Sequence, residues 1–297
     1  MSGTSAGAAT ASVPRVAVIG GGPAGLMAAE VLSKAGAALS VYVFDAMPSV
    51  GRKFLLAGKG GLNLTHAEPA ASFNTRYAEA ASALAPMLSA FGADELRQWT
   101  HDLGIETFVG SSGRVFPKDM KAAPLLRHWL HRLRAAGVQF SMRHRWTGWS
   151  DSGALRFASP AGELELQADA VVLALGGGSW SRLGSDGAWV PWLQQQGVSV
   201  APLLPSNCGF DVAGWSTHFS SRFAGQPFKS VAIALTDSLG HEFTRRGEFV
   251  ATATGLEGSL IYAASSLLRE EISRSGSATL RLDLLPDKSA AQVLADV

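Results

Sequence analysis

The sequence predicts an α/β fold that opens with a βαβ dinucleotide-binding unit, and two observations carry this prediction. The apolar run of residues 16–19 leads into Gly20-Gly21-Gly22-Pro23-Ala24-Gly25, which satisfies the pattern G-x-G-x-x-G. A helix-forming stretch and a second apolar run, residues 39–44, follow and end in Asp45. Strand, glycine turn, helix, second strand and terminal acid stand in the order that the dinucleotide fingerprint requires.

Each residue of this fingerprint has a physical role. Gly20 allows the tight turn, Gly22 lets the backbone approach a pyrophosphate, and Gly25 lets the helix pack closely on the strand. The helix N-terminus offers free N–H groups to the phosphates. Asp45 would accept the ribose hydroxyls and repel a 2′-phosphate, which disfavours NADP and leaves FAD or NAD. The nucleotide contacts predicted here are Gly20, Gly22, Pro23, Ala24, Gly25, Asp45 and Ala46.

Composition narrows the class of protein. The 297 residues are 47% hydrophobic and 16% charged, which suits a globular enzyme of one large domain or two ordinary ones. The net charge of +1 indicates no partnership with nucleic acid or an anionic membrane. Cys208 is the single cysteine, so no intramolecular disulfide forms, and no metal-ligand spacing occurs. His128 and His131 share a helix face, which we interpret as solvated.

The chain ends and hydrophobic runs predict neither a signal peptide nor a membrane span. Residues 1–13 are small and polar, and we expect a disordered lead-in. No run of 18 apolar residues exists, so we expect a cytoplasmic protein without a membrane partner.

The order of elements predicts the rest of the first domain, residues 14–206. A glycine-rich loop follows Asp45, a helical region spans 77–103 with a break near Gly92, residues 111–124 form loop and turn, and a helix spans 125–136. Alternating runs at 138–142, 154–158 and 163–167 predict a β-meander. The apolar run 168–175 predicts a strand buried on both faces, which ends at Gly176-Gly177-Gly178. This order is typical of FAD-binding domains of the glutathione-reductase type.

From about residue 207 the pattern changes to short alternating runs joined by glycines. The runs at 231–236, 242–243 and 279–284 predict strands, and residues 261–272 predict one helix. We therefore expect a second, mostly β domain over residues 207–297.

Four strings resemble those of the BaiN/YhiN-like family of FAD-dependent flavoproteins. They are GRKFLLAGKGGLNLTH, SSGRVFPKDMKAAP, LALGGGSWSRLGSDGAWVPWLQQQGVSVAPLLPS and ATATGLEGSLIYAAS. The resemblance runs from about Pro14 to the end. It implies a Rossmann-like FAD-binding domain interrupted by an inserted domain with a small β-barrel. It also implies an oxidoreductase, since some members reduce enone carbon–carbon double bonds.

Two departures from the family stand out. The loop at residues 57–66 lacks the Arg-Cys pair of the family's common glycine-rich string, so this chain resembles a subgroup. The chain also stops at Val297, inside the apparent insert, whereas family members continue. We therefore expect the insert to be incomplete and the sequence to be a fragment or a truncated product.

Further site residues are predicted around the cofactor. Arg52 and Lys53 would lie near the phosphates, and the loop holding Gly58 would lie against the flavin. Lys59 could stabilise the reduced ring, and His66 is the candidate proton donor. Trp146 would meet the adenine through its backbone, and Asp186 would bind the cofactor or cap a helix. Beyond the first βαβ unit, the predicted cofactor contacts are Arg52, Lys53, Gly60, Gly61, Asn63, Thr65, Trp146, Gly176, Gly177, Gly178 and Asp186.

The function expected from these features is hydride transfer through non-covalently bound FAD to or from a small-molecule substrate. Ser181 stands where a second G-x-G-x-x-G would need its last glycine, so NADH or NADPH would visit the flavin only transiently. The absence of a C-x-x-C motif excludes disulfide reduction. Two alternatives stay open: a flavin-dependent tRNA-modifying transferase, which the neutral charge and the lack of a basic stripe disfavour, and a non-catalytic flavin-binding redox protein.

Overall fold

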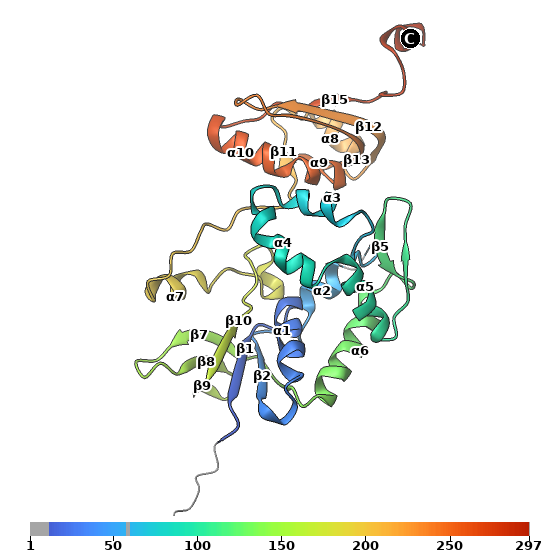
Figure 1. Ribbon diagram of the computed structural model, residues 1–297. Coiled ribbons are helices and arrows are strands. Elements are labelled where there is room, and N and C mark those ends of the chain that lie inside the picture. Colours follow the sequence, from blue (N-terminus) through green and yellow to red (C-terminus); the bar gives the residue numbers. More distant parts are fainter. Residues whose placement is uncertain (1–11, 58–59, 297) are drawn as a thin grey trace, which may run out of the picture. The chain divides into compact units, whose positions relative to one another are not determined.

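A computed structural model describes residues 12–57 and 60–296 (Figure 1). The chain divides into two compact units, residues 1–201 and 202–297. The sequence had placed this boundary at 206/207, and most of the expected lead-in, residues 1–13, lies outside the described residues. No described helix combines the length and the apolar character that crossing a membrane requires.

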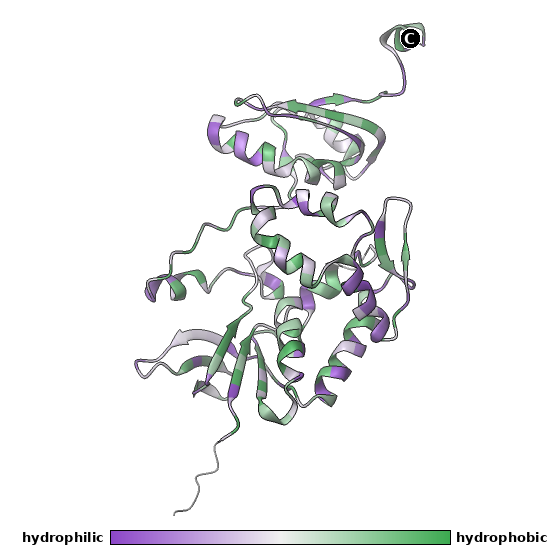
Figure 2. Cartoon of the chain, in the orientation of Figure 1, coloured by the Kyte–Doolittle hydropathy of each residue, from purple (hydrophilic) through white to green (hydrophobic). Residues whose placement is uncertain are grey.

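A four-stranded parallel sheet forms the centre of the first unit. Its strands are β1 (Arg15–Ile19), β2 (Ser40–Asp45), β6 (Gln139–Met142) and β10 (Ala170–Leu173), in the order β10-β1-β2-β6. Figure 2 shows apolar residues along β1, β2 and β10. The predicted βαβ unit is confirmed: β1 and β2 pair in parallel and α1 (Pro23–Ser33) connects them.

The two faces of this sheet bury different partners, because alternate residues of a strand point to opposite sides. Val18 and Val43 pack in one cluster with α1 and with α6 (Ala122–Ala135). Ile19 and Phe44 pack in another cluster with the β-meander. The central strands are therefore covered on both faces, as parallel strands usually are.

The meander consists of β7 (Arg145–Trp149), β8 (Leu155–Ser159) and β9 (Gly162–Leu166), paired antiparallel in that order. The sequence-based assignment of residues 138–142 to the meander is wrong, because these residues form β6 and pair in parallel with β2. An alternating run has the same local pattern in either sheet, so only the pairing partner distinguishes the two.

Two segments of the first unit that the sequence predicted as loops contain helices or strands. The glycine-rich segment after Asp45 contains α2 (Arg52–Ala57) and β3 (Thr65–His66). Residues 111–124 contain β5 (Arg114–Pro117), which pairs with β3 and with β4 (Thr107–Val109). The helix break at Gly92 is confirmed, since α4 (Ala81–Ala90) ends before it and α5 (Ala93–Asp102) begins after it. The other helices here are η1 (Gly36–Ala38), α3 (Ala70–Asn74), η2 (Thr75–Ala80), η3 (Ser181–Leu183) and α7 (Val190–Gln195).

Strand β10 was predicted to be buried on both faces, and the structure shows otherwise. Among the described residues it pairs with β1 alone and forms the edge of the sheet. Val171 and Leu173 are each 37% exposed. An apolar run therefore predicted the strand and its parallel pairing, but not its place at the edge.

The second unit is a five-stranded antiparallel sheet with helices packed on it. The strand order is β11 (Phe210–Asp211), β14 (Gly255–Glu257), β13 (Glu242–Ala251), β12 (Pro227–Thr236) and β15 (Arg281–Asp283). Its helices are α8 (Thr217–Phe223), α9 (Ser259–Ala263), α10 (Ser265–Ser275) and α11 (Ala290–Ala295). The sheet is as expected, but the helices cover about as many residues as the strands, so the unit is mixed α and β rather than mostly β. Over the described residues β11 and β15 are edges that do not pair with each other, so no closed barrel is formed there.

A carboxylate of α10 holds the turn between β12 and β13. Glu271 Oε2 accepts hydrogen bonds from Ser238 N (3.0 Å), Ser238 Oγ (2.8 Å) and Arg274 Nη1 (2.7 Å). The bonds from the Ser238 backbone and hydroxyl are the main cause of a lowered pKa for Glu271. Since the pKa is lowered in the folded protein, this stabilisation is present above the ordinary value of 4.5 and is lost as the pH falls through the lowered one.

Replacing Glu271 by glutamine should lower the melting temperature of the second unit at neutral pH and make it less dependent on pH below 4.5. The amide offers a single uncharged acceptor oxygen to three donors. Glu270→Gln, which removes a neighbouring carboxylate paired only with Arg269, is the matched control and should have little effect. Differential scanning calorimetry between pH 3 and 7 measures both. Equal melting curves for Glu271→Gln and the unmodified protein would contradict the assigned role.

Candidate functional site

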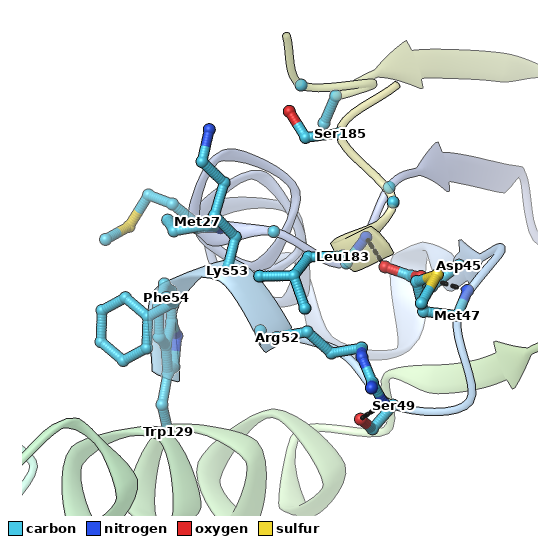
Figure 3. Close-up of a pocket in the computed structure, with 18 of the residues that line it drawn as sticks. Met27, Asp45, Met47, Ser49, Arg52, Lys53, Phe54, Trp129, Leu183 and Ser185 are labelled. Carbon is cyan, nitrogen blue, oxygen red and sulfur yellow. Dashed lines mark hydrogen bonds between the residues drawn. The ribbon is translucent and has the colours of Figure 1, made fainter. Parts of the chain in front are cut away.

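A cavity of about 610 Å³ opens at the carboxyl ends of β1 and β2, where α/β sheets usually bind ligands. This volume lies within the range of small-molecule sites. Figure 3 shows Asp45 and Ser49 at one side of the cavity, and Phe54 and Trp129 at the other. The cavity therefore has a polar end and an apolar end. Its lining residues are Gly20, Gly21, Gly22, Pro23, Met27, Asp45, Met47, Ser49, Gly51, Arg52, Lys53, Phe54, Leu62, Asn63, Leu64, Leu96, Trp99, Leu125, Trp129, Ala174, Leu175, Gly176, Gly177, Leu183, Gly184 and Ser185.

The three glycines of the fingerprint have different structural roles. Gly20 has a φ of +110°, and a Cβ there would collide with the carbonyl oxygen of Ala174. A Cβ at Gly25 would collide with the carbonyl oxygen of Gly20. At Gly22 an added Cβ meets nothing within 4 Å. Gly20 is thus required by its contact with the segment after β10, and Gly25 by the close approach of α1 to the end of β1, whereas Gly22 leaves open space for a ligand.

The N-terminus of α1 presents backbone donors next to this open space. The first intrahelical bond runs from Leu26 N to Gly22 O (2.9 Å), so the N–H groups of Ala24 and Gly25 precede the helical ladder. Pro23 stands at the first helical position, where its missing N–H costs nothing. Such a terminus is a general site for phosphate groups.

Asp45 lies at the end of β2, as predicted. Its Oδ2 accepts a hydrogen bond from Gly21 N (2.8 Å) and its Oδ1 one from Met47 N (2.7 Å). Each oxygen keeps a further lone pair for a ribose hydroxyl. Burial raises the pKa of Asp45, although the Met47 and Gly21 amides and the charges of Arg145 and Arg52 oppose the rise.

The predicted cations Arg52 and Lys53 both line the cavity. Arg52 begins α2, its Nη1 lies 3.4 Å from Ser49 Oγ, and its Nε is buried without a hydrogen-bond partner. Lys53 donates from Nζ to Ser179 Oγ (2.5 Å), which joins α2 to the glycine turn after β10. Arg52 and Lys53 therefore line the same cavity as the N-terminus of α1, whose free backbone N–H groups can bind phosphate.

The apolar end comes from side chains that sequence reasoning did not assign to the site. Met27 belongs to α1, Phe54 to α2, Trp99 to α5 and Trp129 to α6. Trp99 and Trp129 form an edge-to-face pair with ring centroids 4.7 Å apart. No motif in the sequence joins these positions, because they meet only when four helices pack together.

A partly buried ion pair holds this helix packing in place. Glu30 Oε1 on α1 accepts hydrogen bonds from Trp99 Nε1 (3.0 Å) and Arg132 Nη2 (2.6 Å). The Arg132 guanidinium also lies over the Trp99 ring, 5.6 Å from its centroid. Glu30 thereby ties α5 and α6 to α1 behind the aromatic wall.

The predicted flavin loop is only partly at the cavity. Asn63 lines it, whereas Gly60, Gly61 and Thr65 do not, and Thr65 pairs with Val115 in the small sheet of β3, β4 and β5. Gly58 and the candidate Lys59 lie outside the described residues, so their role stays a prediction.

The glycine turn after β10 closes one wall. Gly176 and Gly177 line the cavity, and Gly178 does not. Ser185, absent from the sequence-based set, also lines it and is 7% exposed, with its hydroxyl lacking a partner. The sequence pointed to Ser185 only through its position, two residues before Gly187, in a string that resembles the family.

A second hollow of about 80 Å³ lies on the other side of Asp45 and contains the predicted residues Ala46, Trp146 and Asp186. Asp186 does not cap a helix, since α7 begins at Val190 with Trp189 as its N-cap residue. Asp186 Oδ2 instead accepts a hydrogen bond from Arg145 Nη1 (2.9 Å), and Oδ1 accepts one from Ala188 N (3.1 Å). Burial opposes these bonds, but together they lower the pKa of Asp186.

His66 lies away from the main cavity, at a third hollow of about 670 Å³. Its Nε2 lies 2.9 Å from the carbonyl oxygen of Ser112, to which it can donate, and its Nδ1 accepts from Glu68 N (3.1 Å). Both ring nitrogens are thus engaged locally, which gives no support to a role as proton donor. The described residues contain no cluster of His, Cys, Asp or Glu able to hold a metal ion.

The fold and this cavity together define a dinucleotide-binding α/β protein of the Rossmann type. The model of the family described as "HI0933-like protein Rossmann domain" matches residues 14–275, so the chain belongs to this family. This confirms the resemblance that the four sequence strings indicated.

One curated relative is the "3-dehydro-bile acid delta(4,6)-reductase" of Clostridium scindens, 27% identical over 281 residues. The alignment covers 94% of this chain and 66% of the relative, so the chain spans less than two thirds of the relative's length.

Similar solved structures include a flavocytochrome c3 fumarate reductase in an open conformation and THI4 of Thermovibrio ammonificans. The first has a TM-score of 0.43 and 19% identity, covering 55% of this chain and 34% of that one. The second has a TM-score of 0.39 and 19% identity, covering 63% of this chain and 64% of that one. TM-scores this low support no statement about function.

Proposed function

We propose that this protein is an FAD-dependent oxidoreductase that reduces a carbon–carbon double bond conjugated to a carbonyl group. The observation that carries the cofactor is the open space at Gly22, the N-cap residue of α1, in a cavity that Asp45 also lines. The reaction class rests on the family and on the reductase activity for which the Clostridium scindens relative is named. When bound, FAD would supply the acceptance and donation of a hydride.

The residues present fit an adenine dinucleotide. The amides of Ala24 and Gly25 would hold the diphosphate, with Arg52 and Lys53 offsetting its charge. Asp45 would accept the hydroxyls of the adenosine ribose. The hollow around Trp146 lies beside Asp45, where an adenine would follow the ribose.

The apolar end of the cavity supports a hydrophobic reacting group. Phe54, Trp99, Leu125 and Trp129 keep water away from this end, which strengthens every electrostatic interaction inside it. NADH or NADPH would reach the cofactor only transiently, because the sequence has a single dinucleotide motif.

The absorption spectrum of the purified protein tests the cofactor, and anaerobic reduction with NADH and then NADPH tests the donor. Carvone, a cyclic conjugated ketone, then tests reoxidation, with limonene as the hydrocarbon of the same carbon skeleton. A flavin spectrum with reoxidation by carvone alone supports the reductase. A flavin that carvone does not reoxidise would point to a non-catalytic flavin protein, and a protein that binds no FAD contradicts the proposal.

Asp45 makes FAD binding depend on pH. Because burial raises the pKa of this carboxyl from 3.8, protonation should begin to weaken FAD at a higher pH than an ordinary aspartate would. Asp45→Asn should weaken FAD at neutral pH by about 1.5–3 kcal/mol and remove this pH dependence. Fluorescence titration of FAD between pH 4 and 8 measures both effects, and identical pH profiles for the two proteins would remove Asp45 from the site.

A further inference from the structure

Positive charge is concentrated in one stretch of this nearly neutral chain. Residues 120–150 contain no Asp or Glu. Their six Lys and Arg residues are Lys121, Arg127, Arg132, Arg134, Arg143 and Arg145, whereas the whole chain has a net charge of +1. The near-zero overall charge therefore conceals a local excess of positive charge in this stretch.

Part of this positive charge lies on one exposed face of helix α6. Arg127, His131 and Arg134 stand at positions i, i+4 and i+7, which share one face of a helix, and all three are exposed. Leu125 and Trp129 lie on the opposite face, are buried and line the main cavity. One helix thus separates a cationic surface from the proposed cofactor site.

The cations of this surface are free of local neutralisation. Arg132 pairs with Glu30 and Arg145 with Asp186, so those two charges are used inside the fold. Among the residues that the structure describes, Arg127 and Arg134 form no ion pair. The Arg134 guanidinium lies over the Phe140 ring as a cation–π pair, 5.4 Å from the centroid, which leaves its charge available.

We propose that the α6 face formed by Arg127, His131 and Arg134 docks a small acidic electron-carrier protein. Charge complementarity requires an acidic partner. An electron carrier fits because α6, about 10–12 Å across with its side chains, is all that separates this face from the cavity. Two one-electron carriers would each give one electron, and solvent would supply the two protons that complete reduction of the cofactor. The inference rests on the proposed oxidoreductase function and names its electron donor.

Other acidic partners fit the face less well. An RNA-binding surface usually adds exposed aromatic side chains for stacking, and the aromatic residue of this helix, Trp129, is buried on the other side. An anionic membrane would be met by large apolar side chains between the cations, and the exposed positions of α6 are basic (127, 128, 131 and 134) or alanine (123 and 135). RNA and vesicles therefore serve as competing probes.

Binding of a plant-type ferredoxin, an acidic carrier, tests the proposal with a readout independent of turnover. Isothermal titration at low salt should show binding that weakens steeply as salt rises. The double variant Arg127→Gln, Arg134→Gln should weaken this binding about tenfold, because steering by surface charge is lost. Glutamine keeps the helix propensity of arginine, so α6 should stay folded.

The matched control is the double variant Arg222→Gln, Arg245→Gln, which removes two exposed charges from the second unit and should leave ferredoxin binding unchanged. Cytochrome c, a basic carrier of similar size, should not bind. Absence of ferredoxin binding, equal binding by both double variants, or tighter charge-dependent binding of tRNA or phosphatidylserine vesicles would each overturn the inference. FAD binding and carvone reduction are measured separately, so failure of the proposed function is distinguishable.

Discussion

Replacing Gly22 by aspartate is expected to abolish FAD binding while leaving the first unit folded. Gly22 is the N-cap residue of α1, its φ of −78° is ordinary, and an added Cβ meets nothing within 4 Å. Aspartate is a preferred N-cap, so its carboxylate would accept hydrogen bonds from the amides meant for the diphosphate. At about 4 Å from a phosphate, the like charges cost about 4 kcal/mol, or roughly a thousandfold in affinity.

Gly22→Asn tests whether FAD binding is lost through the added charge or through a side chain that occupies the same backbone amides. Asparagine caps a helix as well as aspartate does but carries no charge, so it should weaken FAD much less. Equilibrium dialysis gives the affinities, and thermal melting without FAD should show both variants as stable as the unmodified protein. Wild-type FAD affinity in Gly22→Asp would show that the cofactor site has been placed wrongly.

Replacing Gly25 by alanine is expected to cause a large loss of stability, whereas Gly22→Asp is expected to affect FAD binding and not folding. In an ordinary helix this change would stabilise by roughly 1 kcal/mol. Here the new Cβ collides with the carbonyl oxygen of Gly20 and lies 3.2 Å from the Ala174 Cβ. Helix α1 would have to move away from β1, so we expect a loss of about 1–3 kcal/mol or more in the free energy of unfolding.

Gly22→Ala is the control for this stability measurement, because it adds the same methyl group three residues earlier into open space. Urea unfolding followed by tryptophan fluorescence measures both variants. The control should lower the free energy of unfolding by no more than about 1 kcal/mol, the typical cost of alanine at an N-cap. If Gly25→Ala is as stable as the control, the close approach of α1 to β1 is not what requires glycine.

Local patterns predicted those parts of the fold whose partners are near in sequence. The βαβ unit, the helix break at Gly92 and the change of pattern near residue 207 were all recognisable, because each depends on turn residues and short-range periodicity. The same reasoning failed for residues 138–142, whose alternation is compatible with a meander or a parallel sheet. It also missed β5, a short strand among turn residues that exists because β3 and β4 pair with it.

The polar end of the candidate site was determined by the sequence alone. Gly20, Gly22 and Asp45 belong to one motif whose spacing dictates where its backbone amides and carboxylate lie. The apolar end and the cationic face of α6 were decided by tertiary structure. Trp99 and Trp129 reach the cavity only because Glu30 and the packing of three helices bring them there, and Arg127 and Arg134 form a surface only because Leu125 and Trp129 turn inward. Contacts between residues distant in the chain follow from which faces are buried together, and no local spacing encodes that choice.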